Sequence, residues 1–124
     1  MLADNPIQPV LLVLDLEVAK KFYAEKLGLP VLDEDEHRLV VGSGPGRLIL
    51  SLSTEGSSDE QTKAAWSVDD LKAEVSELRS RGVSIEEYDS DELRTSGGIA
   101  DVGFARAAWI MDPFGNALSM LEPK

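Results

Sequence analysis

A turn between two apolar runs near the C-terminus constrains the fold of this chain more than any other feature. The run Trp109–Glu122 contains a turn in which Pro113 presets φ for the second position, while Gly115 and Asn116 tolerate positive φ. Apolar residues on both sides of the turn predict a β-hairpin buried on at least one face. A fainter copy, Gly44–Leu52, again leads from a glycine and proline turn into an apolar strand. The chain therefore indicates a duplicated fold.

Each half of the chain predicts a strand, a helix and three further strands. In the first half, Val10–Leu14 is apolar at every position, which predicts a strand covered on both faces. Asp15 is the expected N-cap of the helix that follows. In the second half, Ala64–Val68 is the strand and Asp69 or Asp70 the cap. The helices should end at Gly28 and Gly82, an exposed acidic turn should cover Asp33–Glu36, and further strands are expected at Leu29–Leu32, His37–Val41, Leu48–Leu52, Val83–Tyr88 and the hairpin arms.

These repeats predict one domain, residues 1–124, made of two modules. Module one spans about 7–53, a polar linker covers 54–62, and module two spans about 63–122. The extra residues of the second half fit the turn-rich segment 90–103, and residues 1–6 are expected to form a loose tail. The predicted class is α+β, with two βαβββ modules forming a cupped mixed sheet and helices on its outer face.

The composition limits the kinds of molecule that the protein is expected to bind. A net charge of −11 repels nucleic acid and attracts cationic small molecules, although it could also serve only to maintain solubility. No apolar run approaches the roughly 20 residues that a membrane helix requires. The chain has no cysteine, and its N-terminal residues lack the apolar segment of a signal peptide. We therefore expect a cytoplasmic protein without nucleic-acid or membrane partners.

The residues do not form a recognisable catalytic set. His37, the single histidine, lies beside the acidic turn, where a solvated surface residue is expected rather than a general base. Ser51 and Ser119 have no histidine predicted nearby, which argues against a Ser-His-acid arrangement. The glycines of 42–46 lie between two strands and do not open a helix, so they do not form a phosphate-cradling loop. No catalytic residue is predicted.

Several motifs follow one another in a defined order along the chain: Val13–Glu17, Phe22-Tyr23, Leu27–Leu29, Ser67–Leu71 and Asp112–Asn116. This order resembles the vicinal oxygen chelate superfamily, the group of glyoxalases, bleomycin-resistance proteins and extradiol dioxygenases. The resemblance extends from about Ile7 to Glu122. It implies the paired βαβββ fold and, in members that perform chemistry, one divalent metal held by His, Gln or Glu side chains from both halves.

Carried over by this resemblance, the four usual metal positions fall on Gln8, Ser51, Lys63 and Ser119, with Leu50 as the alternative to Ser51. Gln8 could act as a neutral oxygen ligand. Lys63 offers only hydrogen-bond donors, and serine hydroxyls are poor metal ligands beside imidazole or carboxylate. We therefore expect neither a metal nor another cofactor, which argues against metal-dependent catalysis.

Metal-free relatives hold cationic, partly aromatic drugs, and the leading hypothesis is a homodimeric, metal-free small-molecule-binding protein of this type, with drug sequestration as a candidate role. Lys63 and Arg106 could instead favour an anionic ligand. Trp66 should turn toward the helices, and Tyr88 and Arg94 border a segment that could form a lid. The expected ligand-binding residues are Gln8, Ser51, Lys63, Arg106, Trp109 and Ser119. The alternatives are a glyoxalase-like lyase or isomerase with an atypical metal site, and a partner-binding protein with a vestigial cavity.

Overall fold

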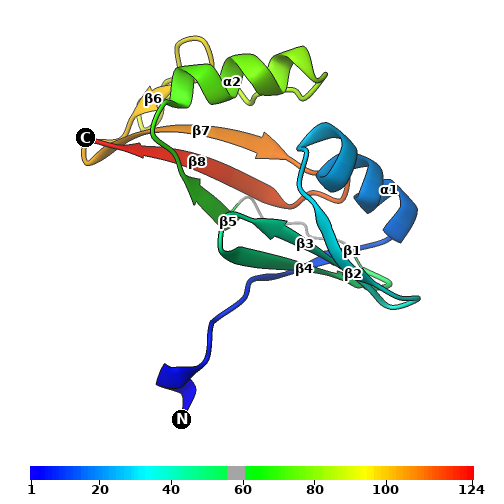
Figure 1. The fold of residues 1–124 in the computed structure, drawn as a ribbon. Coiled ribbons are helices and arrows are strands. Elements are labelled where there is room, and N and C mark those ends of the chain that lie inside the picture. The colour runs from blue at the N-terminus through cyan, green and yellow to red at the C-terminus, as the bar shows by residue number, and fades with distance from the viewer. Residues whose placement is uncertain (56–60) are drawn as a thin grey trace. The chain divides into compact units, whose positions relative to one another are not determined.

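The computed structural model of the chain describes residues 1–55 and 61–124. It divides into two compact units, Met1–Ser57 and Ser58–Lys124, termed here the first and second modules (Figure 1). Each module contains one four-stranded mixed sheet with a helix on one face, which confirms the α+β class and the duplicated βαβββ plan. The predicted linker 54–62 falls partly on residues 56–60, which lie outside the described residues.

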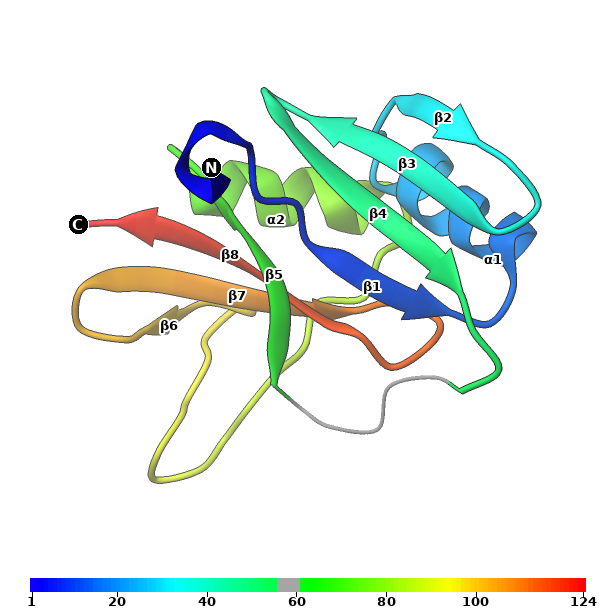
Figure 2. The same cartoon turned by 90° about the horizontal axis from the view of Figure 1, so that it is seen from below.

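The first module orders its strands β1-β4-β3-β2 (Figure 2), with β1 parallel to β4 and the other pairs antiparallel. A short 3-10 helix, η1, occupies part of the segment expected to be a loose tail. The elements are η1 Leu2–Asp4, β1 Val10–Val13, α1 Leu16–Lys20, the π-helical continuation η2 Lys21–Lys26, β2 Val31–Glu34, β3 Arg38–Ser43 and β4 Gly46–Leu52.

The helix of the first module begins and ends where the sequence indicates. The carboxylate of Asp15 accepts a hydrogen bond from the backbone N–H of Val18 at 3.1 Å, which confirms the predicted cap. Gly28 takes a positive φ of 75° just beyond the helix. Between these ends, Phe22 and Tyr23 are buried with their rings in edge-to-face contact, centroids 5.0 Å apart. This helical face covers one side of the first sheet through contacts with β3 and β4.

Two predictions for the first module are wrong in part. The strand expected to be covered on both faces buries Leu11 and Val13 but leaves Val10 and Leu12 about half exposed, at 55% and 45%. Because every residue of this run is apolar, the sequence could not show that the helix covers only one face of the sheet. The acidic turn is shorter than predicted, because Asp33 and Glu34 belong to β2.

Ion pairs explain why an acidic pair can occupy this edge strand. A carboxylate oxygen of Glu34 lies 3.1 Å from the ammonium of Lys20, and Asp33 accepts a hydrogen bond from the guanidinium of Arg38 at 2.9 Å. Charged residues on an edge strand also discourage pairing with other chains.

The second module repeats the plan with the strand order β5-β8-β7-β6, in which β5 is parallel to β8. Asp70 caps α2 by accepting a hydrogen bond from the N–H of Ala73 at 3.1 Å, and Gly82 follows the helix with a φ of 82°. The helix buries Leu71 and Val75. The elements are β5 Thr62–Ser67, α2 Leu71–Ser80, β6 Ala100–Asp101, β7 Ala105–Met111 and β8 Ala117–Pro123.

The prediction of a strand at Val83–Tyr88 is wrong. The strand that pairs with β7 at this edge is β6, which lies in the segment expected to be an insertion. The backbone N–H of Glu86 donates to the carbonyl of Trp109 at 2.9 Å, which docks the run beside β7 without forming a strand. The chain then turns away and returns through Gly98 at a φ of 84°. A Cβ on Gly98 would lie 2.6 Å from Cγ2 of Ile85, so the return path requires glycine.

The C-terminal hairpin is confirmed, with one difference in the role of its turn residues. Met111 of β7 pairs with Ala117 of β8, and Gly115 takes the expected positive φ of 85°. Asn116 does not take a positive φ; it is buried, and its amide donates to the carboxylate of Asp112 at 2.7 Å. Asn116 therefore stabilises the turn through its side chain.

Candidate functional site

The two faces of the second sheet are distinguished by strand register. The backbone N–H of Leu71, at the start of α2, donates to Glu122 of β8 at 3.1 Å, so Glu122 lies on the α2 face. Alternation along β8 places Ser119 on the opposite face. Trp109 of β7 and Ala65 of β5 both lie opposite Ser119 in the ladder and share that face with it. We term this side the Trp109 face.

Trp109 is the one large aromatic residue that β7 and β8 present on the Trp109 face. Ser119, directly opposite Trp109, is only 4% exposed, and Ala107 on the same strand is also buried. The ring of Tyr88 meets the indole at 90° with centroids 5.6 Å apart. The two rings form a right-angled aromatic corner, a shape that offers ring faces to a flat or cationic ligand.

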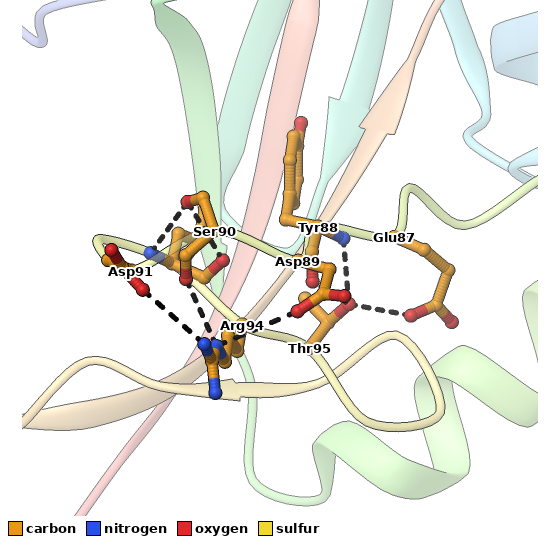
Figure 3. A network of polar contacts seen from close by, with 8 residues as sticks. Glu87, Tyr88, Asp89, Ser90, Asp91, Arg94 and Thr95 are labelled. Atoms are coloured by element: carbon orange, nitrogen blue, oxygen red, sulfur yellow. Dashed lines mark hydrogen bonds and ion pairs between the residues drawn. The ribbon is translucent and has the colours of Figure 1, made fainter.

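A local hydrogen-bond network positions Tyr88 for this contact. The hydroxyl of Thr95 accepts from the N–H of Tyr88 at 2.9 Å and donates to the carboxylate of Glu87 at 2.6 Å (Figure 3). Arg94 pairs with Asp91 at 3.4 Å in the turn beyond. Figure 3 shows the Tyr88 ring pointing away from these polar contacts. The segment 87–95 therefore holds the aromatic ring in a defined place.

Arg106 is not brought together with Trp109 and Ser119. It lies opposite Glu122 on the α2 face, where its guanidinium is 3.3 Å from the Glu122 carboxylate. Residues three apart in a strand point to opposite faces, so alternation along β7 already separates Arg106 from Trp109.

The two predictions for β5 have different outcomes. Trp66 pairs with Met120 on the α2 face, which confirms its predicted direction toward the helix. Lys63 lies at an irregularity of the ladder between Thr62 and Ala64, and alternation therefore does not fix its side.

The remaining predicted residues belong to the first module. Ser51 lies in β4 opposite Leu12 of β1, and Gln8 precedes β1. Gln8 and Ser51 are thus in one module, whereas Lys63 and Ser119 are in the other. Their convergence at one cavity, and the ligand-binding role of all six residues, stay predictions.

The side chains at the four positions suggested by the resemblance do not fit a catalytic divalent metal. They comprise one amide, two hydroxyls and one ammonium, whereas such metals take imidazole, carboxylate or thiolate ligands. Leu50, the alternative to Ser51, is a fully buried apolar residue. Within residues 1–55 and 61–124, no group of three His, Cys, Asp or Glu side chains could hold a metal ion.

Tyr88 is the residue that the predicted ligand-binding set lacks. The sequence offered Tyr88 as a possible stacking ring at the border of the inserted segment, but not as a neighbour of Trp109. In the sequence, Tyr88 is simply an aromatic residue followed by a polar run. Its contact with Trp109 depends on how that run folds back toward β7. A local pattern does not contain this information.

Two βαβββ modules, each with a helix on one face of a mixed sheet and a hairpin at its end, define a protein of the vicinal oxygen chelate type. The model of the Glyoxalase/Bleomycin resistance protein/Dioxygenase superfamily matches residues 6–120. The chain belongs to this superfamily.

Solved structures show the same fold at low sequence identity. A glyoxalase family protein from Enterococcus faecalis aligns with a TM-score of 0.73 and 21% identity, over 98% of this chain and 100% of that one. A bleomycin-binding protein complexed with bleomycin gives 0.72 and 20%, over 97% and 99%. Lactoylglutathione lyase from Agrobacterium tumefaciens gives 0.67 and 21%, over 95% and 92%. No curated protein matches the chain.

A membrane-spanning helix is absent from the part of the chain that the structure describes, since every helix there is too short or too polar to cross a bilayer.

Proposed function

We propose that this chain is a metal-free, cytoplasmic small-molecule-binding protein of its superfamily that sequesters flat, cationic drug-like compounds. The observation that carries the proposal is the aromatic corner of Tyr88 and Trp109 beside Ser119. At Ser119, where the resemblance places a metal ligand, the chain has a buried hydroxyl. The site thus offers ring surfaces for binding and lacks a carboxylate for coordination.

The charge of the chain supports a cationic ligand. A net charge of −11 raises the local concentration of cations at the surface, and a cation over an aromatic ring gains about 0.5–2 kcal/mol. Similarity to a bleomycin-binding protein agrees with this class of ligand, whereas similarity to a lyase supports the enzymatic alternative. Binding of a drug to the metal-free protein would distinguish the binding protein from the enzymatic alternative.

Titration with metal-free bleomycin is expected to quench tryptophan emission saturably in the wild-type chain. Trp109→Leu should remove most of the quenching, because Trp66 lies on the α2 face and Trp109 on the other. Tyr88→Leu should weaken binding about tenfold, since it removes one wall of the corner. Fluorescence and calorimetric titrations measure the two effects.

Phe104→Leu is the matched control, because Phe104 is an aromatic residue of the second module that is 73% exposed and has no ring contact in the described residues. It should bind like the wild type. Equal quenching in wild type and Trp109→Leu would remove Trp109 from the site. Stoichiometric zinc, nickel or manganese after chelator-free purification would favour the lyase or isomerase. If neither bleomycin nor a metal binds, the partner-binding alternative gains support.

Homodimerisation is the second part of the proposal. The face of β1 that α1 does not cover exposes Val10 and Leu12, and a second copy of the chain is the commonest cover for such a surface. We expect light scattering to give twice the chain mass at micromolar concentration. Leu12→Glu should shift the protein toward monomer, while Val18→Glu, at an exposed position on α1, should not. A monomeric wild type would contradict this part.

A further inference from the structure

A hollow lies on the α2 face of the second module, away from Trp109. Its volume is about 530 Å³, within the range of small-molecule sites. Ile99 supplies partly exposed apolar surface, Leu71 is almost fully buried, and charged side chains surround them. All of its lining residues belong to the second module. We term it the α2 hollow; it is lined by Asp70, Leu71, Lys72, Ser96, Ile99 and Arg106, together with the carboxylates of Asp101 and Glu122.

The three carboxylates of the α2 hollow already have partners within the chain. Asp70 accepts from the N–H of Ala73, and Glu122 accepts from the N–H of Leu71 and from Arg106. These bonds also occupy N–H groups of the first turn of α2. The helix terminus itself is therefore not the anion site.

Asp101 makes the shortest hydrogen bonds of the three carboxylates. It accepts from the ammonium of Lys124 at 2.6 Å and from the N–H of Gly103 at 2.8 Å. These two hydrogen bonds, that from Lys124 first, hold the pKa of Asp101 below its usual value. Asp101 therefore stays ionised and engaged at neutral pH, and does not require a cation from solution.

Three polar groups of the hollow can donate hydrogen bonds to a ligand. Within the described residues, the ammonium of Lys72 and the hydroxyl of Ser96 have no hydrogen-bond or ion-pair partner. Arg106 uses one guanidinium nitrogen for Glu122 at 3.3 Å, and its side chain is 60% exposed. An ammonium, a hydroxyl and the remaining guanidinium N–H groups suit a carboxylate.

We propose that the α2 hollow binds a small organic monocarboxylate whose apolar body rests on Ile99. The charge around the hollow favours a ligand with a single negative charge over a dianion. Lys72 and Arg106 face three carboxylates, of which Asp101 is neutralised by Lys124, and the chain as a whole is acidic. A dianion such as phosphate would meet this acidic field with twice the charge and with no apolar part to bury. This site is independent of the drug-binding proposal.

The test is an amide-resolved NMR titration of the full chain with 2-naphthoate at low salt. Saturable shifts are expected at 71–73, 96–101 and 106, with a dissociation constant near or below about 1 mM. Arg106→Gln should weaken binding about tenfold and Lys72→Gln by a smaller factor, because each removes a charged donor. Both side chains are exposed, so both variants should fold.

Arg81→Gln is the matched control, since Arg81 is an exposed arginine paired with Glu77 beyond the last turn of α2. It should bind naphthoate as the wild type does. The neutral isostere 2-naphthamide should bind at least about fivefold more weakly, because it lacks the charge that the donors recognise. Equal binding of acid and amide, unchanged affinity in Arg106→Gln, shifts confined to the surroundings of Trp109, or no saturable shift would each overturn the assignment.

Discussion

Asp112→Ala is expected to lower the free energy of unfolding by about 3 kcal/mol or more. Asp112 is only 5% exposed and accepts from the N–H groups of Phe114 and Asn116 and from the Asn116 amide, at 2.7–2.8 Å. Alanine would leave these donors without the carboxylate, and a buried donor without a partner costs about 1–3 kcal/mol. Urea unfolding followed by circular dichroism measures the change.

Asp89→Ala is the control, because Asp89 is an almost fully exposed aspartate in a turn of the same module. It should change the free energy of unfolding by less than about 0.5 kcal/mol. Asp112→Asn keeps one acceptor oxygen and should fall between the two. A loss below about 1 kcal/mol in Asp112→Ala would show that the carboxylate does not hold the hairpin together.

Local chemistry made most of the fold predictable. Asp15 and Asp70 cap their helices with side-chain hydrogen bonds, and Gly28 and Gly82 follow the helices with positive φ. Such signals act within a few residues, and both halves of the chain repeat them in the same order. The family could therefore be inferred from the sequence, and the match of the family model over residues 6–120 confirms it.

Long-range contacts account for what the sequence did not show. Val83 and Ile85 alternate with polar residues and predict a strand, yet one bond from Glu86 to Trp109 docks this run and β6 forms further along. The position of Tyr88 beside Trp109 depends on the same docking. Strand alternation, in contrast, was sufficient to separate Arg106 from Trp109.

A designed metal site tests whether the predicted residues of the two modules converge. The variant Gln8→His, Ser51→Glu, Lys63→His and Ser119→Glu is expected to bind zinc or nickel with micromolar affinity. Lys63→His removes an ammonium that repels a divalent ion, and two imidazoles with two carboxylates are suitable ligands for either metal. The new ligands lack hydrogen-bond partners to orient them, so the affinity should fall well below that of a natural site. Calorimetry with zinc measures it.

Burial of Ser119 gives this design a second readout. A glutamate at a position that is 4% exposed would bury a carboxylate without a partner, so the metal-free variant should melt below the wild type. Zinc should restore much of that loss, because the metal binds only the folded state. The triple variant that keeps Lys63 should show the lower melting temperature without the restoration. A folded quadruple variant that takes up no zinc would show that Gln8, Ser51, Lys63 and Ser119 do not share a cavity, and the ligand-binding role proposed for them would then be withdrawn.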